Sequence, residues 1–187
     1  CLVGSEMWIR DRYSFAALLR NNTDLSSRTT LKQEVSFIEK YVFLYQVRFP
    51  DRLAYQFTVA DDVAAVEIPK FSLQPLVENY FVHGVNFSRV DNALSLKAWR
   101  EAGIVHVKIV DNGRGLSPEA VKAVNQKLKQ PLAAEQQHSI GLQNVYSRMH
   151  DSFGDGFKMT INSNDQQGVT VLLLSLIHIS EPTRQAE

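Results

Sequence analysis

Apolar residues between positions 71 and 86 recur at the spacing of an α-helix of about 3.6 residues per turn. They form one stripe, made of Leu73, Leu76, Val77, Tyr80, Phe81 and Val85. Asn79, His83 and Asn86 follow i, i+4, i+7 spacing, so we expect them to share the neighbouring face. That face is either solvated or the border of a binding site, and this helix alone does not decide between the two.

The N-terminal third of the chain is also patterned as helix. Residues 13–21 predict a short helix, and Thr30 with Gln33 predicts a capping box for a longer one. Apolar residues of the longer helix alternate at steps of four and three, which gives a seam of Leu31, Val35, Ile38, Val42, Tyr45 and Phe49. This seam packs either on its own domain or on a partner helix. Pro50 and Asp51 are expected to end the helix.

From residue 53 onward the pattern changes to strands. Residues 53–59 alternate, Asp61 and Asp62 predict a turn, and residues 63–68 predict a short second strand. Residues 93–99 with 104–110, and residues 157–162 with 169–174, predict two hairpins. Helices are expected after the Ser117 cap and over residues 140–153, with a polar loop at 130–139. The sum is an α+β domain: a mixed, largely antiparallel sheet with helices on one face.

Composition restricts the class of protein. The chain has 187 residues, with 20 basic residues balancing 20 acidic ones. The chain therefore lacks the excess of basic residues that is typical of proteins that bind nucleic acid. No apolar run approaches the roughly 20 residues of a membrane span. Cys1 is the single cysteine, which excludes an intramolecular disulfide framework. Residues 1–12 and 175–187 resemble translated sequencing-adapter read-through, so we expect both ends to be non-native.

Two glycine-containing segments are candidates for ligand binding. The strand that ends at Asp111 continues as Asp-Asn-Gly-Arg-Gly through Gly113 and Gly115, where the backbone can approach a ligand closely. Asp111 can accept a hydrogen bond from an exocyclic amine. The segment Ser-Ile-Gly-Leu at residues 139–142 opens a helix, and free N–H groups there suit phosphate oxygens. Each segment alone is equally consistent with an ordinary glycine turn.

The order of these segments resembles the GHKL, or Bergerat, module, the ATP-binding domain shared by gyrase, MutL and histidine kinases. Leu-Gln-Pro-Leu-Val-Glu-Asn-x-x-x-His-Gly at residues 73–84 is similar to the N box of LytS-type sensor histidine kinases. The resemblance implies a two-layer ATP-binding sandwich of a mixed sheet and helices. It divides the chain into a helical remnant of the dimerisation and linker region at 13–50 and a catalytic domain at 51–174.

The resemblance also assigns roles to residues. Asn79 is implied to coordinate Mg²⁺, and Asp111 to accept from the adenine amino group. The implied nucleotide-binding residues further include His83 facing the phosphates, Gly113, Gly115, Ile140, Gly141, Leu142 and Thr170; Asn79 and His83 are the implied catalytic pair. Glu78 lies about 100° round the helix from Asn79 and could equally be structural. ATP and Mg²⁺ are therefore the expected cofactors.

Two positions depart from the family pattern. Val82 stands where the family usually has a lysine that contacts phosphate, so this positive charge is missing unless His83 or Arg148 supplies it. Ser139 stands where the family has a glycine. These departures favour an alternative: a nucleotide-responsive, catalytically weak interaction module of the same fold. A third reading, an ATPase of the gyrase type, needs a glutamate one turn before Asn79, where the chain has Pro75.

None of the five histidines lies in the motif that receives phosphate in these kinases. The resemblance thus implies a fragment of a two-component sensor kinase that binds ATP or ADP but does not phosphorylate itself. Its expected partners are a cognate response regulator and the dimerisation helices of the full-length kinase, and no nucleic acid. We expect a cytoplasmic domain of a protein anchored in the inner membrane.

Overall fold

A computed structural model describes residues 28–130, 140–165 and 167–176, and its centre is a five-stranded sheet. The strand order is β2-β4-β5-β7-β6. The strands are β2 (Leu53–Val59), β4 (Asn92–Glu101), β5 (Ile104–Asp111), β6 (Phe157–Ser163) and β7 (Val169–Leu176). β2 pairs with β4 in parallel, and every other pairing in this sheet is antiparallel. The sheet is therefore mixed and largely antiparallel, as the sequence predicts.

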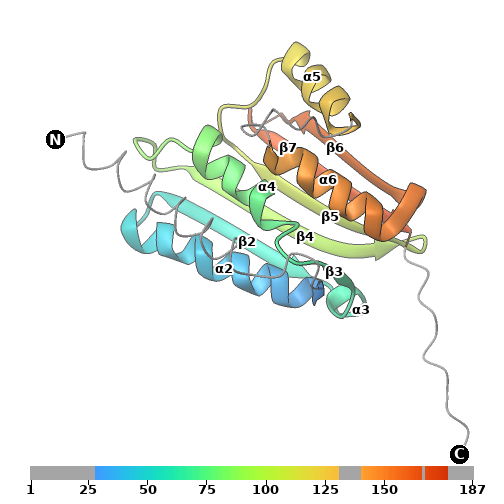
Figure 1. The fold of residues 1–187 in the computed structure, drawn as a ribbon. Coiled ribbons are helices and arrows are strands. Elements are labelled where there is room, and N and C mark those ends of the chain that lie inside the picture. Colours follow the sequence, from blue (N-terminus) through green and yellow to red (C-terminus); the bar gives the residue numbers. More distant parts are fainter. Residues whose placement is uncertain (1–27, 131–139, 166, 177–187) are drawn as a thin grey trace, which may run out of the picture.

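Helices form a second layer on one face of this sheet (Figure 1). They are α2 (Leu31–Arg48), α4 (Gln74–Asn79) and α6 (Ile140–Phe153). A further helix, α5 (Pro118–Leu128), packs beside β6, and a short 3₁₀ turn (Gly154–Gly156) leads from α6 into β6. Ser117 caps α5 by accepting a hydrogen bond from the backbone N–H of Ala120 at 3.2 Å, which confirms the expected cap. The predicted α+β class and its two layers are confirmed.

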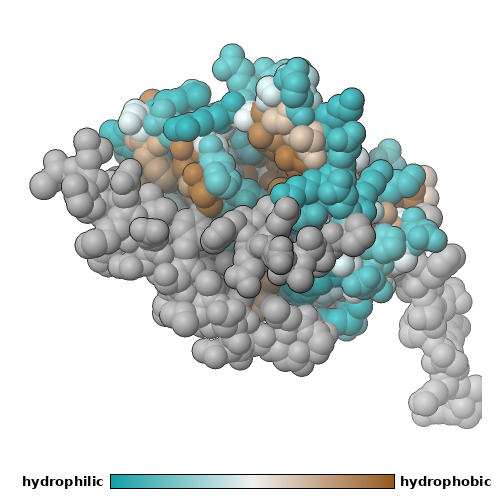
Figure 2. All heavy atoms as spheres, turned by 45° about the horizontal axis from the view of Figure 1, so that its top comes forward, coloured by the Kyte–Doolittle hydropathy of each residue, from teal (hydrophilic) through white to brown (hydrophobic). Residues whose placement is uncertain are grey.

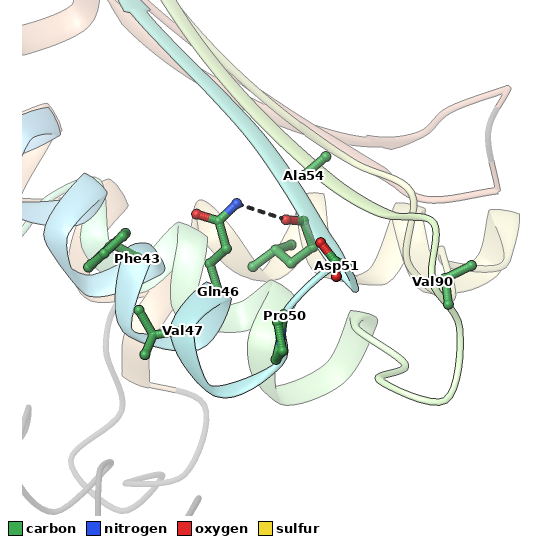
Figure 3. Close-up of a pocket in the computed structure, with 8 residues that line it drawn as sticks. Phe43, Gln46, Val47, Pro50, Asp51, Ala54 and Val90 are labelled. Atoms are coloured by element: carbon green, nitrogen blue, oxygen red, sulfur yellow. Dashed lines mark hydrogen bonds between the residues drawn. The ribbon is translucent and has the colours of Figure 1, made fainter.

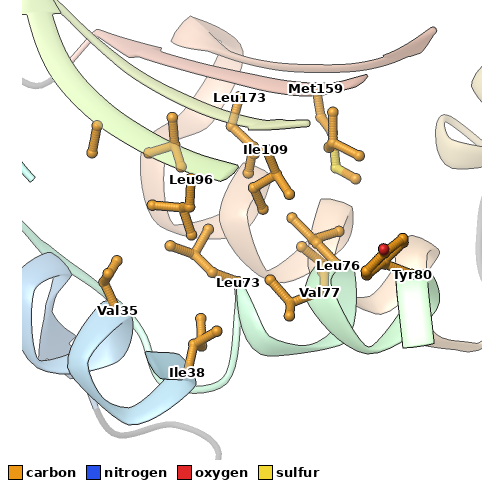
Figure 4. Packing of buried hydrophobic residues seen from close by; sticks show 14 of the residues in the cluster. Val35, Ile38, Leu73, Leu76, Val77, Tyr80, Leu96, Ile109, Met159 and Leu173 are labelled. Carbon is orange, nitrogen blue, oxygen red and sulfur yellow. The ribbon is translucent and has the colours of Figure 1, made fainter. Parts of the chain in front are cut away.

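The hydrophobic core lies between the two layers. Side chains alternate along each strand, so that one face of the sheet is buried and the residues of the other are half-buried or exposed. Figure 4 shows Leu96, Ile109, Met159 and Leu173 of the sheet facing Val35 and Ile38 of α2 and Leu73, Leu76 and Val77 near α4. A fully buried side chain of this size contributes roughly 1.5–3 kcal/mol to stability. This core holds α4 and α6 in place against the sheet.

The seam of α2 packs on its own domain, which is the first of the two alternatives for this helix. Its side chains from Leu31 to Tyr45 are at most 5% exposed and belong to the same core as the sheet. Thr30 and Gln33 form the predicted capping box. The helix ends at Arg48, before Pro50. A boundary between two regions at residue 50 stays a prediction, since α2 and the sheet share one core.

Between β2 and α4 the sequence prediction is partly wrong. Asp61 and Asp62 begin a one-turn helix, α3 (Asp61–Ala64), instead of a turn. The expected strand at 63–68 shrinks to β3 (Glu67–Pro69), which pairs with β1 (Arg28–Thr30) in a separate two-stranded sheet. Two acidic residues at the first turn suit the positive end of a helix, and this preference prevails over the apolar alternation. Val63 is fully buried as a residue of this helix and not as a residue of a strand.

The amphipathic segment at 71–86 is not one continuous α-helix. α4 ends at Asn79 and continues as a π-helical turn over Tyr80–Gly84, in which the N–H of Val85 donates to the carbonyl of Tyr80 at 2.8 Å. The expected apolar stripe is buried from Leu73 to Phe81, and Val85 is half-buried. π-Turns of this kind occur mainly at functional sites. Because the turn is wider than an α-helical turn, the side chains after Asn79 point in other directions than a continuous α-helix would give them.

Asn86 therefore does not lie on a helical face with Asn79 and His83, and that expectation is wrong. It lies beyond the helix, where its Oδ1 accepts from the N–H of Ser88 at 3.0 Å. Its own N–H donates to Oδ1 of the buried Asn92 at 3.1 Å. The Asn92 amide also donates to the carbonyl of Arg52. Asn86 thus belongs to a turn that is fixed to the first residue of β4.

Some predictions lie outside the described residues: the helix at 13–21, the loop at 131–139 with Ser139, the non-native N-terminus at 1–12, and the tail from residue 177 onward. β7 runs to Leu176, two residues past the predicted strand. Among the described residues, no helix combines the length and hydropathy that crossing a membrane requires. On the face shown in Figure 2, the described surface is mostly hydrophilic, with hydrophobic atoms visible between the hydrophilic ones.

Candidate functional site

Asp111 is the last residue of β5, and the residue is 9% exposed. Its Oδ1 accepts two backbone hydrogen bonds, from the N–H of Gly113 at 2.7 Å and from the N–H of Val169 at 3.2 Å. Burial raises the pKa of Asp111, and these two hydrogen bonds oppose that rise. Because both bonds use the same oxygen, Oδ2 is left to accept a hydrogen bond from a ligand.

The loop after Asp111 touches the end of the π-turn. A Cβ atom on Gly113 would lie 2.7 Å from Cα of Gly84 and 2.8 Å from its carbonyl carbon and oxygen. Gly113 is therefore required for close packing between two backbones, in addition to any room it gives a ligand. The contact brings the segment that contains Asn79 and His83 to the end of β5, as the predicted site requires.

The β6–β7 hairpin closes the other side of Asp111. Gly115 has a positive φ of 66°, and a Cβ atom there would lie against the carbonyl oxygen of Gln167. Asn164 donates from Nδ2 to the backbone carbonyl of Asp111 at 2.8 Å. Thr170 pairs with Val110 across β5 and β7 and is half-buried. Asp111 is thus held by residues from the loop after β5 and from this hairpin.

Asn79 is the last residue of α4 and is half-buried. Within residues 28–130, 140–165 and 167–176, no hydrogen bond to its side chain is recorded, so its amide oxygen can accept a ligand. His83 lies on the π-turn and is exposed. Val82, which stands at the family's lysine position, is 43% exposed. An amide and an imidazole therefore border the site without internal partners among the described residues.

The start of α6 lies next to α4 in the helical layer (Figure 1). The helix begins at Ile140, as predicted, although the side chain of Ile140 is outside the description. A Cβ atom on Gly141 would meet no described residue within 4 Å, so the described part of the chain leaves the backbone there open on one side. Leu142 is half-buried against the core. The open backbone at the first turn of a helix fits the phosphate contact predicted for Gly141.

Two charged residues that could have served the site are engaged elsewhere. Glu78 is 6% exposed and accepts a hydrogen bond from Nε2 of Gln74 at 2.7 Å, which supports its structural alternative. Arg148 donates from Nη2 to the carbonyl of Lys70 at 2.6 Å. It therefore does not stand free to replace the lysine that Val82 lacks. No cluster of three or more metal-binding His, Cys, Asp or Glu residues occurs in the described part of the chain.

Sequence reasoning missed Tyr80, Gly84 and Asn164 as residues that build this site. Tyr80 is 3% exposed, and its ring would lie 2.8 Å from a Cβ atom on Gly84. Burial raises the pKa of Tyr80, and the neighbouring carboxylate of Asp111 raises it further. Gly84 could have been found as a second glycine required for close packing. Asn164 could not, because a turn rich in Asn, Asp, Gln and Gly gives no sign of which residue points inward.

Two grooves on the described surface lie apart from these residues or touch only Asp111. One of about 440 Å³ lies between the end of α2 and the start of β2 (Figure 3). It is lined by Phe43, Gln46, Val47, Pro50, Asp51, Leu53, Ala54 and Val90, none of which belongs to the predicted site. Another of about 250 Å³ reaches Asp111 from β2, β4 and β5, but contains neither Asn79 nor Gly141. Neither is the site formed by α4, β5 and α6.

Comparison with known proteins relates the chain to bacterial sensor kinases. It is 31% identical to the uncharacterized protein YwpD of Bacillus subtilis over 90% of its own length and 58% of that protein. It is 27% identical to the sensor protein LytS of Oceanobacillus iheyensis, covering 83% of the chain and 27% of that protein. It is 26% identical to the sensor histidine kinase YesM of Bacillus subtilis, covering 86% of the chain and 26% of that protein. No model of a protein family matches the chain.

The chain thus spans little more than half of YwpD and about a quarter of the two sensor kinases. Among solved structures, the catalytic domain of histidine kinase ThkA matches with a TM-score of 0.57 at 13% identity, covering 80% of this chain and 94% of that one. The mycobacterial sensor histidine kinase MprB matches with a TM-score of 0.52 at 10% identity, covering 80% and 96%. The chain is therefore a homologue of the LytS and YesM sensor histidine kinases and has the fold of a histidine kinase catalytic domain.

Proposed function

We propose that this chain is the ATP-binding catalytic domain of a two-component sensor histidine kinase. The observation that carries the proposal is the hydrogen bonding of the Asp111 carboxylate. Its Oδ1 is held by two backbone N–H groups, while Oδ2 is left to accept from the exocyclic amine of adenine. Such an arrangement discriminates adenine from guanine, because guanine presents a carbonyl oxygen at the matching position. The carboxylate is also partly desolvated, which strengthens a hydrogen bond to it.

Mg²⁺ and the phosphates would lie on the side of Asn79 and Gly141. The half-buried amide of Asn79 has no recorded partner among the described residues and offers the neutral oxygen that suits Mg²⁺. A bound Mg²⁺ would neutralise part of the negative charge of the phosphates. The open backbone at Gly141 and the dipole of α6 favour phosphate oxygens. His83 is exposed beside Asn79 and is the further candidate for a phosphate contact.

The full-length enzyme would transfer the γ-phosphoryl group of ATP to a histidine on its dimerisation helices, and then to an aspartate of its response regulator. The chain's share is positioning and charge neutralisation, which dominate phosphoryl transfer. None of the histidines in this chain lies in a phosphoacceptor motif. We therefore propose that this chain binds ATP or ADP without phosphorylating itself. Location in the cytoplasm, and a membrane anchor in the full-length protein, are part of the proposal.

A second candidate function is a nucleotide-responsive, catalytically weak interaction module. Val82 favours it, because an exposed apolar side chain replaces a cation and Arg148 is engaged with the carbonyl of Lys70. Titration calorimetry with a non-hydrolysable ATP analogue and Mg²⁺ separates the two functions. Saturable binding at micromolar concentrations that Asp111→Asn weakens supports the kinase domain. Binding that requires millimolar nucleotide favours the module.

A further inference from the structure

The turn that leads into α4 is strained and lacks a cap of its own. Phe71 has a φ of 56°, in the left-handed region that an aromatic residue rarely adopts. The N-cap residue of α4 is Leu73, whose side chain has no atom that can accept a hydrogen bond from the first turn of the helix. Ser72 holds the turn locally by donating from Oγ to the carbonyl of Pro69 at 2.6 Å. A strained turn persists only where surrounding contacts determine it.

One such contact comes from α2. Glu34 is 4% exposed, and its two carboxylate oxygens each accept a backbone hydrogen bond from this turn. Oε2 accepts from the N–H of Phe71 and Oε1 from the N–H of Leu73, both at 3.1 Å. A carboxylate from another helix therefore holds two backbone N–H groups of the segment that leads into α4. The bidentate arrangement fixes the turn in orientation as well as in distance.

A second contact comes from α6. Arg148 donates from Nη2 to the carbonyl of Lys70 at 2.6 Å, one residue before Phe71. Its guanidinium is close enough to Glu34 for their opposite charges to interact, and Glu34 raises the pKa of Arg148 against the lowering by burial. The turn before α4 is therefore held by α2 on one side and by α6 on the other. We call Glu34, Arg148 and the turn at 70–73 the α4 clamp.

The α4 clamp links the two elements that would contact the phosphates. α4 ends at Asn79, the candidate Mg²⁺ ligand, and α6 begins at Ile140 with the open backbone of Gly141. The two elements could hold metal and phosphate together only if they keep a fixed spacing. A buried carboxylate is a costly way to hold a helix if packing alone is needed, because apolar residues of similar volume would pack without desolvation.

We propose that Glu34 and Arg148 are positioning residues that set Asn79 against the start of α6, so that metal and phosphate are bound together. The inference rests on the proposed function, because it concerns the metal-dependent part of nucleotide binding. Neither residue touches the nucleotide in this account. Their effect should therefore appear in the gain of affinity that Mg²⁺ brings, and not in the binding of the base at Asp111.

The test is the dissociation constant of ADP, measured by calorimetry with Mg²⁺ and again with EDTA. In Glu34→Gln we expect the Mg²⁺-dependent gain in affinity to fall by at least about fivefold, a common size for coupling between two ligands. The dissociation constant in EDTA should stay near the wild-type value. Arg148→Lys keeps the charge, loses the planar fork and should act in the same direction. Glu39→Gln, an exposed glutamate on the same helix, is the matched control and should change neither constant.

Amide hydrogen exchange of the nucleotide-free protein makes the test independent of binding. Glu34→Gln should raise exchange in residues 74–84 and also in the first turn of α6, whereas Glu39→Gln should not. The inference is overturned if folded Glu34→Gln keeps the full Mg²⁺ gain, or if its affinities in Mg²⁺ and EDTA fall in parallel. If the wild type binds no nucleotide, the proposed function fails, and exchange alone decides: unchanged exchange at the start of α6 overturns the clamp.

Discussion

The backbone of Gly113 lies directly against the backbone of Gly84, so that a Cβ atom on Gly113 would lie 2.7 Å from Cα of Gly84. This contact joins the loop after β5 to the π-turn after α4, two segments almost 30 residues apart in the sequence. The side chains proposed to hold the base and the metal are brought together by this approach. The contact also makes a direct prediction about stability.

Gly113→Ala should destabilise the domain by about 1–3 kcal/mol, the usual cost of overpacking a close contact. The added methyl group meets backbone atoms of Gly84, which cannot move aside as a flexible side chain could. Gly141→Ala is the matched comparison, because its Cβ atom meets no atom of the described residues within 4 Å and alanine favours a helix. Urea unfolding measures both. Equal stability of Gly113→Ala and the wild type would contradict the close approach.

Asp111→Asn should leave the fold largely intact while weakening the binding of adenine nucleotides by about 10- to 100-fold. The amide oxygen of asparagine can still accept from the N–H groups of Gly113 and Val169. Its NH₂ group would then face the exocyclic amine of adenine, donor against donor. Fluorescence titration with a labelled ADP checks the affinity, and thermal unfolding checks the fold. An unchanged affinity in a folded variant would remove Asp111 from the base site.

Val82→Lys should strengthen the binding of ATP by up to about fivefold, the size expected of a single exposed charge contact. Val82 is 43% exposed and two residues beyond the π-turn's first residue, at the family's lysine position. The gain should shrink as salt is raised. Val90→Lys adds the same charge at a position that is 70% exposed and should give no gain. A similar gain in both variants would mean that only net charge matters.

The pH dependence of stability should reveal the buried carboxylate of Glu34. Burial raises the pKa of Glu34, and backbone hydrogen bonds oppose the rise. Because the folded pKa lies above the unfolded value of about 4.3, the folded protein binds this proton more tightly than the unfolded chain. The contribution of Glu34 to stability is then complete below about pH 4.3 and is lost as the pH rises through the raised value.

Glu34→Gln cannot titrate at this position. The free energy of unfolding of the wild type should therefore fall relative to that of the variant as the pH rises from about 4.3 toward neutrality. Urea unfolding of both proteins at a series of pH values measures the difference. If the wild type instead gained stability over the variant as the pH rose, the pKa of Glu34 would be lowered in the fold, and the balance between burial and hydrogen bonding would be the reverse of that inferred here.

Much of the fold follows from local sequence signals. The seam of α2, the Thr30 capping box and the alternation along β4 and β5 fix these elements because burial and capping act within a few residues. The strand order does not follow, because pairing of β7 between β5 and β6 depends on contacts far apart in the sequence. The helix at Asp61 was misread for a similar reason: Val63 is buried by the surrounding core, which the local pattern does not show.

The site could be predicted in its polar residues but not in its geometry. Asp111, Gly113 and Asn79 stand in recognisable motifs, whereas the π-turn that removes Asn86 from their face has no signature in the residue spacing. Periodicity assumes one helical pitch, and a single wider turn breaks every inference beyond it. Glu34 carries no local sequence signal of its role, since its hydrogen bonds reach residues 37 and 39 positions away.

A crystal structure of this chain with a non-hydrolysable ATP analogue and Mg²⁺ tests the central claim most directly. We predict adenine hydrogen-bonded to Oδ2 of Asp111, Mg²⁺ coordinated by the amide oxygen of Asn79, and phosphate oxygens near the backbone of Gly141. Nucleotide bound elsewhere, or with its base away from Asp111, would contradict the account.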